Sequence, residues 1–329
     1  MARILVTGGA GYVGSHVAKL LAAKGHESVV FDNLTRGHAE FVRWGELILG
    51  DIRDAKALDT VFEKYEFDAV IHFAALAYVG ESVVQPDLYY DVNICGTRSL
   101  LDAMIRADVK KIVFSSTCAV YGEPDHIPIA EDSTLAPVNP YGFTKLACER
   151  MMDDYDQAFG LRSVRLRYFN AAGADLNGEI GEWHEPETHL IPLVLDAASG
   201  RREKISIFGF DYPTLDGTAI RDYIHVEDLA DAHVRALDCL LDGGKTIALN
   251  LGTGEGISVK RVIETATRIT EKEISAHYTE RRAGDPARLI ANPRKAQRIL
   301  GWKARSSSLT EIIQTAWAWH QSHFNGAAK

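Results

Sequence analysis

The sequence predicts an α/β protein built on a doubly wound parallel sheet, and three observations carry this prediction. The first half of the chain repeats a short apolar run, a turn and an amphipathic helical segment. The apolar runs are short and rich in β-branched residues, as expected for strands that are buried on both faces. A cluster of glycines directly follows the first run. Because repeated strand–helix–strand order requires right-handed crossovers, we expect neighbouring strands to lie parallel.

The individual elements follow from this pattern. The predicted strands are Arg3–Thr7, Glu27–Phe31, Leu47–Leu49, Ala69–Phe73, Lys111–Ser115 and Ser163–Arg167. The segment Val13–Ala23 carries its apolar residues on one stripe, which predicts a helix that packs on the sheet.

The strand–helix rhythm breaks after about Tyr168. Residues 170–192 and 209–217 are polar stretches, and the first of them has no clear period. A helix is then predicted over Ala230–Leu241, a strand over Ala248–Leu251 and a packing helix over Leu309–Trp319. We therefore expect two interleaved domains: a nucleotide-binding domain of residues 1–169 plus about 218–252, and a smaller α+β substrate-binding domain of about 170–217 plus 253–329.

Composition narrows the possible functions. The chain has 329 residues, is 46% hydrophobic and carries a formal charge of −9, which argues against nucleic acid or an anionic membrane surface as its main partner. No apolar run approaches the roughly 18 residues that would span a bilayer, and the N-terminal run is too short for a signal peptide. The four cysteines lack metal or redox spacing, so we expect mostly buried, reduced thiols, no metal and a cytoplasmic location.

The turn after the first predicted strand has the chemistry of a dinucleotide site. It reads Thr7-Gly8-Gly9-Ala10-Gly11-Tyr12-Val13-Gly14, and it satisfies G-x-G-x-x-G through Gly9, Gly11 and Gly14. Glycines permit a tight turn and close approach to a pyrophosphate, and the helix that follows directs its N–H groups at the phosphates. Between a strand and a helix, this motif predicts a Rossmann-type site.

Two acidic positions refine the expected cofactor. Asp32 closes the second predicted strand, where a carboxylate binds ribose hydroxyls and repels a 2′-phosphate, so NAD is favoured over NADP. Arg36 is the counter-signal, because a guanidinium there could accommodate that phosphate. Asp51 and Ile52 follow the third strand, where they would suit the adenine edge; Asp51 could equally be a helix N-cap.

The end of the fifth predicted strand supplies hydroxyl groups at the edge where ligands bind in such sheets. It reads Phe114-Ser115-Ser116-Thr117-Cys118-Ala119-Val120-Tyr121-Gly122. Further on, Tyr141 and Lys145 are spaced to share one helix face. A neighbouring ammonium and a positive nicotinamide would lower the pKa of a phenol, so Tyr141 is a candidate general base.

The sequence at this point resembles the extended short-chain dehydrogenase/reductase family. The stretches that carry the resemblance are VTGGAGYVGSH, FDNL, GDIRD, HFAALAYVGES, FSSTCAVYG, NPYGFTKLACE, LRYFNAAGA, HLIP, DGTAIRDYIHVEDLADAH, NLGTGEGISV, RRAGDPARL and LGW. Along nearly its whole length, the chain is similar to members that are isomerases inverting C4 of a UDP-hexose. The implied reaction is UDP-galactose to UDP-glucose, in galactose metabolism, through a 4-keto sugar and with NAD held tightly.

The resemblance also assigns roles to single residues. Tyr141 would be the base, Thr117 would stand in for the usual serine and bridge Tyr141 to the sugar, and Lys145 would bind the nicotinamide ribose. The implied cofactor-binding residues are Gly8, Gly11, Tyr12, Val13, Gly14, Asp32, Asn33, Asp51, Ile52, Phe73, Ala74, Ala75, Asn93, Ser115, Tyr141, Lys145 and Tyr168. The implied substrate-binding residues are Thr117, Tyr141, Phe169, Asn170, His189, Leu190, Arg221, Arg282, Asp285 and Leu289.

Departures from the family pattern leave alternatives open. Ala77 replaces a lysine that many relatives use at the cofactor pyrophosphate, which would weaken NAD retention. Leu289 lies where residue size sets sugar selectivity, so 4-epimerisation of UDP-GlcNAc, a UDP-pentose or UDP-glucuronate stays open. A 4,6-dehydratase would need Asp-Glu where Cys118 and Ala119 stand, and a redox-sensing binding protein would not need Thr117, Tyr141 and Lys145.

The resemblance further implies a homodimer. Members of the family pair helices on one face of the nucleotide domain, which here would be Tyr89–Ala107 and Tyr141–Phe159.

Overall fold

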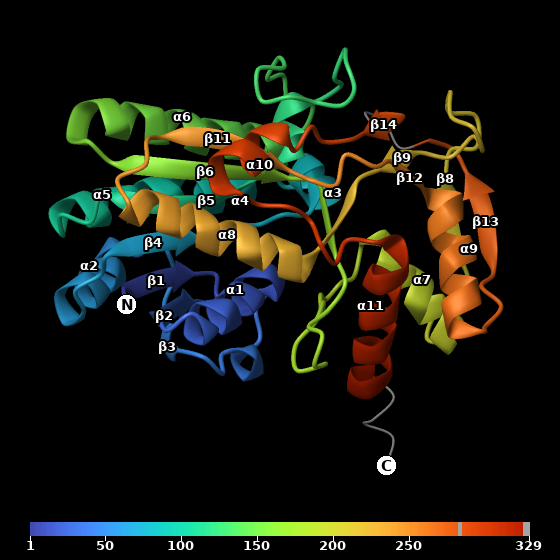
Figure 1. The fold of residues 1–329 in the computed structure, drawn as a ribbon, viewed down its shortest axis with the longest axis horizontal. Coiled ribbons are helices and arrows are strands. Elements are labelled where there is room, and N and C mark those ends of the chain that lie inside the picture. Colours follow the sequence, from blue (N-terminus) through green and yellow to red (C-terminus); the bar gives the residue numbers. More distant parts are fainter. Residues whose placement is uncertain (282–284, 325–329) are drawn as a thin grey trace.

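The computed structural model describes residues 1–281 and 285–324. Its centre is a seven-stranded sheet in the order β11-β6-β5-β4-β1-β2-β3, with every neighbouring pair parallel (Figure 1). The strands are β1 (Arg3–Thr7), β2 (Glu27–Asp32), β3 (Glu46–Leu49), β4 (Ala69–His72), β5 (Lys111–Thr117), β6 (Arg162–Tyr168) and β11 (Ile247–Leu251). The chain order reverses between β1 and β4, which confirms the doubly wound sheet predicted from the sequence.

Helices cover both faces of this sheet. One face packs against α1 (Tyr12–Ala23), α8 (Val226–Leu241) and α10 (Arg294–Leu300), and the other against α2 (Ala55–Lys64), α5 (Gly96–Arg106) and α6 (Pro140–Phe159). Successive strand residues point to opposite cores: Ile4 and Val6 belong to the first, and Leu5 to the second. The strands are therefore apolar on both sides, which is why they read as continuous apolar runs.

The predicted elements agree with the observed ones to within a few residues. β5 continues past the predicted end to Thr117, which carries its hydroxyl to the edge of the sheet. The helix predicted from Ala230 begins at Val226, because the side chain of His225 accepts a hydrogen bond from the N–H of Glu227 and caps it. The C-terminal helix α11 (Leu309–Phe324) extends beyond the predicted Trp319.

A second region lies beside the carboxyl ends of the sheet strands (Figure 1). Its short strands are β7 (Asn170–Ala172), β8 (Ile205–Phe208), β9 (Ile220–Arg221), β10 (Tyr223–His225), β12 (Ile257–Ser258), β13 (Ala276–Thr279) and β14 (Arg288–Leu289). Its helices are α7 (Leu190–Ser199), α9 (Val259–Thr270) and α11, which share one apolar core. The remaining short helical segments are η1 (Ala39–Phe41), α3 (Val79–Val84), α4 (Pro86–Tyr89), the π-helical η2 (Tyr90–Cys95) and η3 (Cys118–Tyr121).

The chain crosses between the two regions more often than expected. The segment from α10 to Trp302, which we expected with the second region, packs in the core of the large sheet beside α8. Trp302 is fully buried there, and its indole N–H donates to the carbonyl of Asp228 at 2.9 Å.

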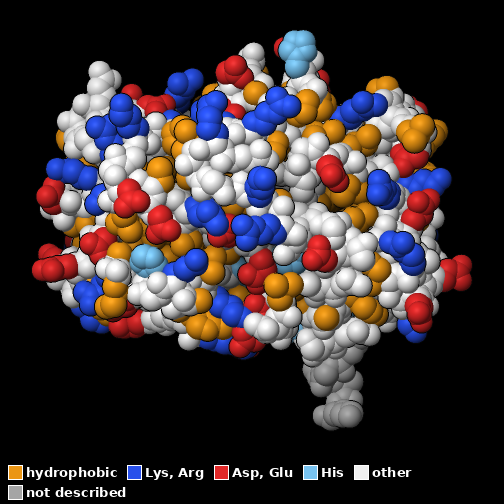
Figure 2. Space-filling view, in the orientation of Figure 1, with side chains coloured by type: hydrophobic (Ala, Val, Ile, Leu, Met, Phe, Trp, Pro, Cys, Tyr) orange, Lys and Arg blue, Asp and Glu red, His pale blue; other side chains and the backbone are white. Residues whose placement is uncertain are grey.

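The structure also shows how the charged side chains and the cysteines are distributed. On the face seen in Figure 2, acidic and basic side chains are interspersed. Among the described helices, none is long and apolar enough to cross a membrane. All four cysteines are free; Cys118 and Cys148 are buried, Cys239 is half-buried and Cys95 on η2 is exposed, so burial is less complete than expected.

Candidate active site

The glycine loop between β1 and α1 fits a dinucleotide. A Cβ on Gly14 would lie 2.4 Å from the carbonyl oxygen of Gly8, so only glycine lets α1 approach the turn this closely. Gly8 has a φ of +73°, and a Cβ there would lie 2.4 Å from the backbone nitrogen of Ala74. Gly11 is the N-cap of α1 and provides no side-chain cap, so the N–H groups of the first turn at Tyr12 and Val13 can serve a phosphate.

Asp32 lies at the end of β2, on the neighbouring strand. It is buried, and its two oxygens accept hydrogen bonds from the N–H groups of Ala10 at 3.0 Å and Leu34 at 2.8 Å. Burial raises the pKa of Asp32, and these bonds lower it. The carboxylate is therefore fixed beside the loop, where a ribose hydroxyl can reach it.

Arg36 is not placed to bind a 2′-phosphate, so it does not favour NADP over NAD. Its guanidinium donates to the carboxylate of Glu81 at 2.7 Å and to the carbonyl of Glu185 at 2.9 Å, and it stacks over the ring of Tyr78 at 4.7 Å. These three contacts commit Arg36 to joining loops rather than to binding a 2′-phosphate.

Asp51 belongs to a polar network at the end of β3. It accepts hydrogen bonds from Asn33 at 2.9 Å and from the guanidinium of Arg53, which holds the pKa of Asp51 well below its usual range. The alternative that Asp51 caps a helix is wrong, because Asp54 caps α2. Ile52 is buried beside them.

Asn93 holds the segment after β4 in place. It is buried, accepts a hydrogen bond from the N–H of Leu76 at 2.8 Å, and donates to the carbonyl of Leu76 and the hydroxyl of Thr144, both at 3.0 Å. The three residues before Leu76, which are Phe73, Ala74 and Ala75, are half-buried. Ala77 is exposed, so no side chain there covers this segment.

The structure brings Thr117, Tyr141 and Lys145 together at the edge of the sheet. Thr117 ends β5, and Tyr141 and Lys145 lie on the first turns of α6. Tyr141 and Thr117 share a side-chain hydrogen bond that lowers the pKa of the phenol, but burial has the larger effect and raises that pKa. Lys145 is buried, donates to the carbonyl of Ser115 at 2.8 Å, and has a pKa lowered to about 8 by burial.

Two further groups line this edge. The hydroxyls of Ser115 and Tyr168 are 2.7 Å apart, which links β5 to β6 beside the ammonium of Lys145. Burial raises the pKa of Tyr168, so it stays a neutral phenol.

A buried ion pair that we did not predict supports the catalytic helix. Glu149 on α6 accepts from Arg167 on β6 at 2.9 Å and from the hydroxyl of Ser116 on β5 at 2.6 Å. This pair fixes α6 against both strands and so sets the position of Tyr141. The sequence shows only that each of these two charged residues stands among apolar ones. It does not show that the two residues contact each other.

The expected substrate residues fall into separate groups. Phe169 and Leu289 share an apolar cluster with Cys118, beside Thr117. Asn170 follows directly on β7 and is half-buried. On β9, the guanidinium of Arg221 forms an ion pair with Asp285. His189 is the N-cap residue of α7, without a capping side-chain hydrogen bond, and Leu190 begins the helix. Arg282 lies outside the described residues.

Asp222 joins the segments that carry these groups, and sequence reasoning missed it. The side chain is buried and accepts N–H hydrogen bonds from Thr253 at 2.8 Å, Gly254 at 3.0 Å and Ala291 at 3.1 Å. It follows Arg221 in a motif that we had considered only for its arginine.

Comparison with known proteins identifies the family of this chain. Residues 4–252 match the model of the NAD dependent epimerase/dehydratase family. A UDP-glucose 4-epimerase of Rhizobium meliloti is 55% identical, with 98% of each chain covered. A Brucella ovis UDP-glucose 4-epimerase in complex with NAD has a TM-score of 0.94 at 51% identity, covering 96% of this chain and 98% of that one. The Bifidobacterium longum enzyme in complex with NAD+ and UDP has a TM-score of 0.94 at 37% identity, covering 98% and 99%.

The family model matches well over half of the chain, and the relative is similar over almost all of it. This chain belongs to the NAD dependent epimerase/dehydratase family and, within it, to the group of the UDP-glucose 4-epimerases.

Proposed function

We propose that this protein interconverts UDP-galactose and UDP-glucose by inverting C4 of the hexose. The observation that carries this proposal is the junction of β5 and α6, where Thr117 bonds to Tyr141 and Lys145 is fixed by the Ser115 carbonyl. Bound NAD would supply a hydride acceptor for C4 and a donor for the opposite face of the oxidised carbon, so that no net oxidation would occur.

In this reaction Tyr141 is the group that accepts and returns the proton of the C4 hydroxyl. Its oxygen takes the proton of the C4 hydroxyl as the sugar is oxidised, and gives it back on reduction. Thr117 donates a hydrogen bond that favours the phenolate and reaches the same sugar oxygen. Because burial alone raises the pKa of Tyr141, nearby positive charge has to favour the phenolate, and Lys145 is the buried cation on the same helix face.

The structure also supports epimerisation over dehydration. Elimination of water would require an acid and a base directly after Thr117, and these positions are Cys118 and Ala119. Cys118 packs among Phe169 and Ala291, and burial raises its pKa to about 12. A neutral thiol in an apolar cluster supplies neither group.

The nucleotide and the substrate are proposed to divide the chain between them. Residues 1–169 with about 218–252 would bind NAD, and about 170–217 with 253–329 would bind the UDP-sugar. Arg221, Arg282 and Asp285 would hold the diphosphate and uridine ribose, because guanidinium groups suit phosphate oxygens. Asn170, Leu190 and the backbone of His189 would contact the substrate near Phe169.

Sugar selectivity is the part of the proposal that rests on Leu289. This residue packs in the same cluster as Phe169, so its volume bears on what fits beside Thr117. The test is a panel of UDP-galactose, UDP-GalNAc, UDP-xylose and UDP-glucuronate, with kcat/KM measured for each. UDP-galactose is expected to have the highest value, and a higher value for another sugar would replace it as the substrate.

A homodimer is proposed from an exposed apolar surface. On the described part of the chain, Val83, Val84, Tyr90 and Phe143 are large exposed apolar residues, and the rings of Tyr90 and Phe143 lie 6.0 Å apart. Tyr90 on η2 and Phe143 on α6 lie within the two helical ranges that are expected to pair, and Val83 and Val84 belong to α3. We also propose a cytoplasmic role in galactose metabolism, which the four free thiols support.

A further inference from the structure

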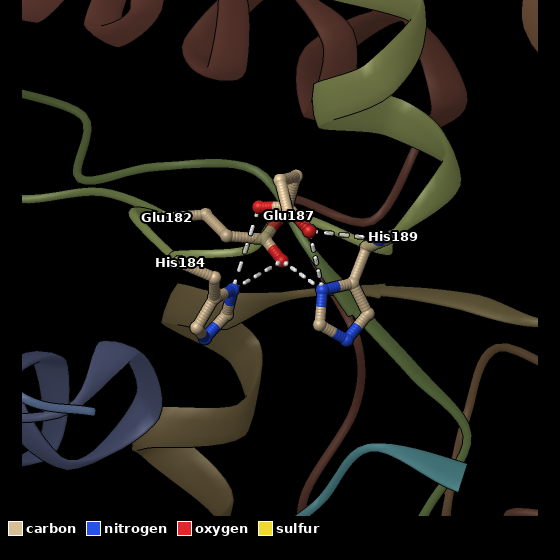
Figure 3. Close-up of side chains that lie close together, drawn as sticks. All are labelled: Glu182, His184, Glu187 and His189. Carbon is tan, nitrogen blue, oxygen red and sulfur yellow. Dashed lines mark hydrogen bonds and ion pairs between the residues drawn. The ribbon is translucent and has the colours of Figure 1, made fainter. Parts of the chain in front are cut away.

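Four metal-ligating side chains converge on one segment outside the catalytic group. Glu182, His184, Glu187 and His189 each present one ligand atom, and these atoms all lie within 4.8 Å of one another. Figure 3 shows the two histidine rings turning a nitrogen toward the two carboxylates. The segment precedes α7, and the ring of His184 lies 6.2 Å from that of Tyr12 and 6.0 Å from that of Tyr78.

The spacing of these atoms matches a four-coordinate metal. The Nδ1 atom of His184 is 3.4 Å from Glu182 and 3.5 Å from Glu187. The Nδ1 atom of His189 is 3.0 Å from Glu182, and it forms a 2.8 Å hydrogen bond with the Oε1 atom of Glu187. Tetrahedral zinc with bonds of about 2.0–2.1 Å holds its ligand atoms about 3.3 Å apart.

Hydrogen bonding alone does not account for His184. Its Nδ1 atom is buried and forms no hydrogen bond of good geometry, although both carboxylates lie within ion-pair distance. Charge-assisted hydrogen bonds between nitrogen and carboxylate are about 2.7–2.9 Å long, so its two carboxylate distances are too long for them but suit neighbouring ligands of one ion.

The carboxylates are buried and oriented in advance. Only 8% of the Glu182 side chain and 13% of the Glu187 side chain are exposed. The Oε1 atom of Glu187 accepts the N–H groups of Thr188 and His189, both at 2.7 Å, whereas its Oε2 atom, which faces His184 at 3.5 Å, is left for a ligand bond.

The backbone of the segment is also held from outside. The carbonyl of Glu182 accepts from the Trp319 indole at 3.3 Å, and that of Glu185 accepts from Arg36 at 2.9 Å. The ring of Trp183 stacks on that of His38 at 3.7 Å. A site built on such support needs little reorganisation to bind an ion.

We propose that Glu182, His184, Glu187 and His189 bind one divalent transition-metal ion, best fitted by zinc. Two imidazoles and two carboxylates suit a borderline ion, and two neutral histidines with two carboxylates balance its charge. Four protein ligands make this a structural site, which would stabilise the segment before α7 and takes no part in the reaction proposed above. We did not predict this site from the sequence, because we had considered metal ligands only at the spacing of the cysteines.

The experiment is a zinc titration of tag-free protein stripped with a chelator, followed by calorimetry, with His184→Ala and Glu182→Gln as variants. His126→Ala removes an exposed histidine elsewhere and is the matched control. We expect one zinc per wild-type chain, a higher Tm with zinc, and affinity on the order of 100-fold lower in both variants but unchanged in the control. Cobalt in place of zinc should show the intense visible absorption of a four-coordinate ion.

Two results would overturn the proposal. One is a wild-type protein that binds no stoichiometric zinc, which would leave the four groups as ion pairs of protonated histidines. The other is zinc binding that both variants retain at wild-type affinity. The wild-type titration decides the question even if a variant fails to fold, and circular dichroism reports whether each variant has folded.

Discussion

At Tyr141, two physical effects act in opposite directions on one phenol. Burial disfavours the phenolate, and the hydrogen bond with Thr117 favours it. In its proposed role as general base, Tyr141 stays protonated in the resting site and becomes effective when positive charge arrives near it. Tyr141 is therefore switched by its surroundings rather than by bulk pH.

Replacing Tyr141 with Phe tests this role. The variant lacks the oxygen that carries the C4 proton, so kcat should fall on the order of 10²-fold or more, while UDP binding measured by calorimetry stays close to wild type. Tyr155→Phe, on the same helix but bonded to Asp102, is the control and should keep kcat within about twofold. A Tyr141→Phe enzyme with near-normal kcat would remove Tyr141 from catalysis.

His72 provides a prediction for stability against pH. It is buried between the hydroxyls of Thr7 at 2.7 Å and Thr97 at 3.0 Å, and burial lowers its pKa from 6.5 to about 3. Between these values the unfolded chain binds more protons than the folded one, so the free energy of unfolding rises with pH and is lost on acidification. The contribution is complete above pH 6.5.

The corresponding variant is His72→Gln, which cannot titrate. From pH 7 to pH 5, the wild type should lose about 2 kcal/mol more unfolding free energy than this variant, measured by urea titration at constant NAD. Other buried histidines, such as His16 and His233, act equally in both proteins. Equal losses in the two proteins would show that His72 is not held neutral in the folded state.

Residue chemistry was predictable where a motif carried it. From the sequence, Thr117 and Asp32 were expected near the ends of strands and Tyr141 at the start of a helix, and the structure has them at these places. Asn93 and Asp222 show why the other residues of the site could not be predicted in detail. Their side chains form hydrogen bonds with backbone groups that are distant in the sequence. Such contacts depend on tertiary packing and leave no local pattern.

At the scale of elements, the turn between β1 and α1 is the most constrained. A Cβ on Gly14 would meet backbone atoms of Gly8 and Gly9 that cannot move without separating α1 from the sheet. The fit at this point directs the first turn of α1 toward a phosphate.

Gly14→Ala should therefore weaken NAD binding by about tenfold or more and destabilise the fold by at least about 1 kcal/mol. Fluorescence titration with NAD and thermal unfolding measure the two effects. Gly80→Ala is the matched control, because a Cβ on Gly80 meets nothing within 4 Å. Wild-type NAD affinity in Gly14→Ala would contradict the close packing of this turn.

Element prediction succeeded where burial is periodic. The strands of the large sheet are apolar on both faces, and α1 carries one apolar stripe, so local pattern and tertiary structure agree. In the segment from residue 170 to 192, no local sequence pattern corresponds to the tertiary structure. Its order comes from side chains of distant elements, including Trp319 and Arg36, and was invisible in the sequence.

At the scale of the whole molecule, the net charge of −9 coexists with sites for two anionic nucleotides. On the face seen in Figure 2, charges of both signs are interspersed, and a few groups are proposed to bind the nucleotides locally: the N-terminus of α1, Lys145 and Arg221. Phosphate recognition by close backbone N–H groups and a guanidinium needs no basic surface.

The proposed dimer gives a prediction at this scale. Tyr90→Glu combined with Phe143→Glu places two charges on the exposed apolar surface of η2 and α6, where burial against a partner would desolvate them. Light scattering should show a dimer for the wild type and a monomer for this variant. Leu215→Glu, at an exposed residue elsewhere, should stay dimeric, and a monomeric wild type would contradict the proposed interface.

The central claim is that C4 is oxidised and reduced on the same sugar, with hydride returned to the carbon it left. The most direct test is UDP-galactose carrying deuterium at C4, incubated with NAD-loaded protein and followed by NMR and mass spectrometry. The account predicts UDP-glucose with the deuterium still at C4 and no accumulation of NADH. Absence of UDP-glucose, or deuterium moved to C6 of a dehydrated sugar, would contradict it.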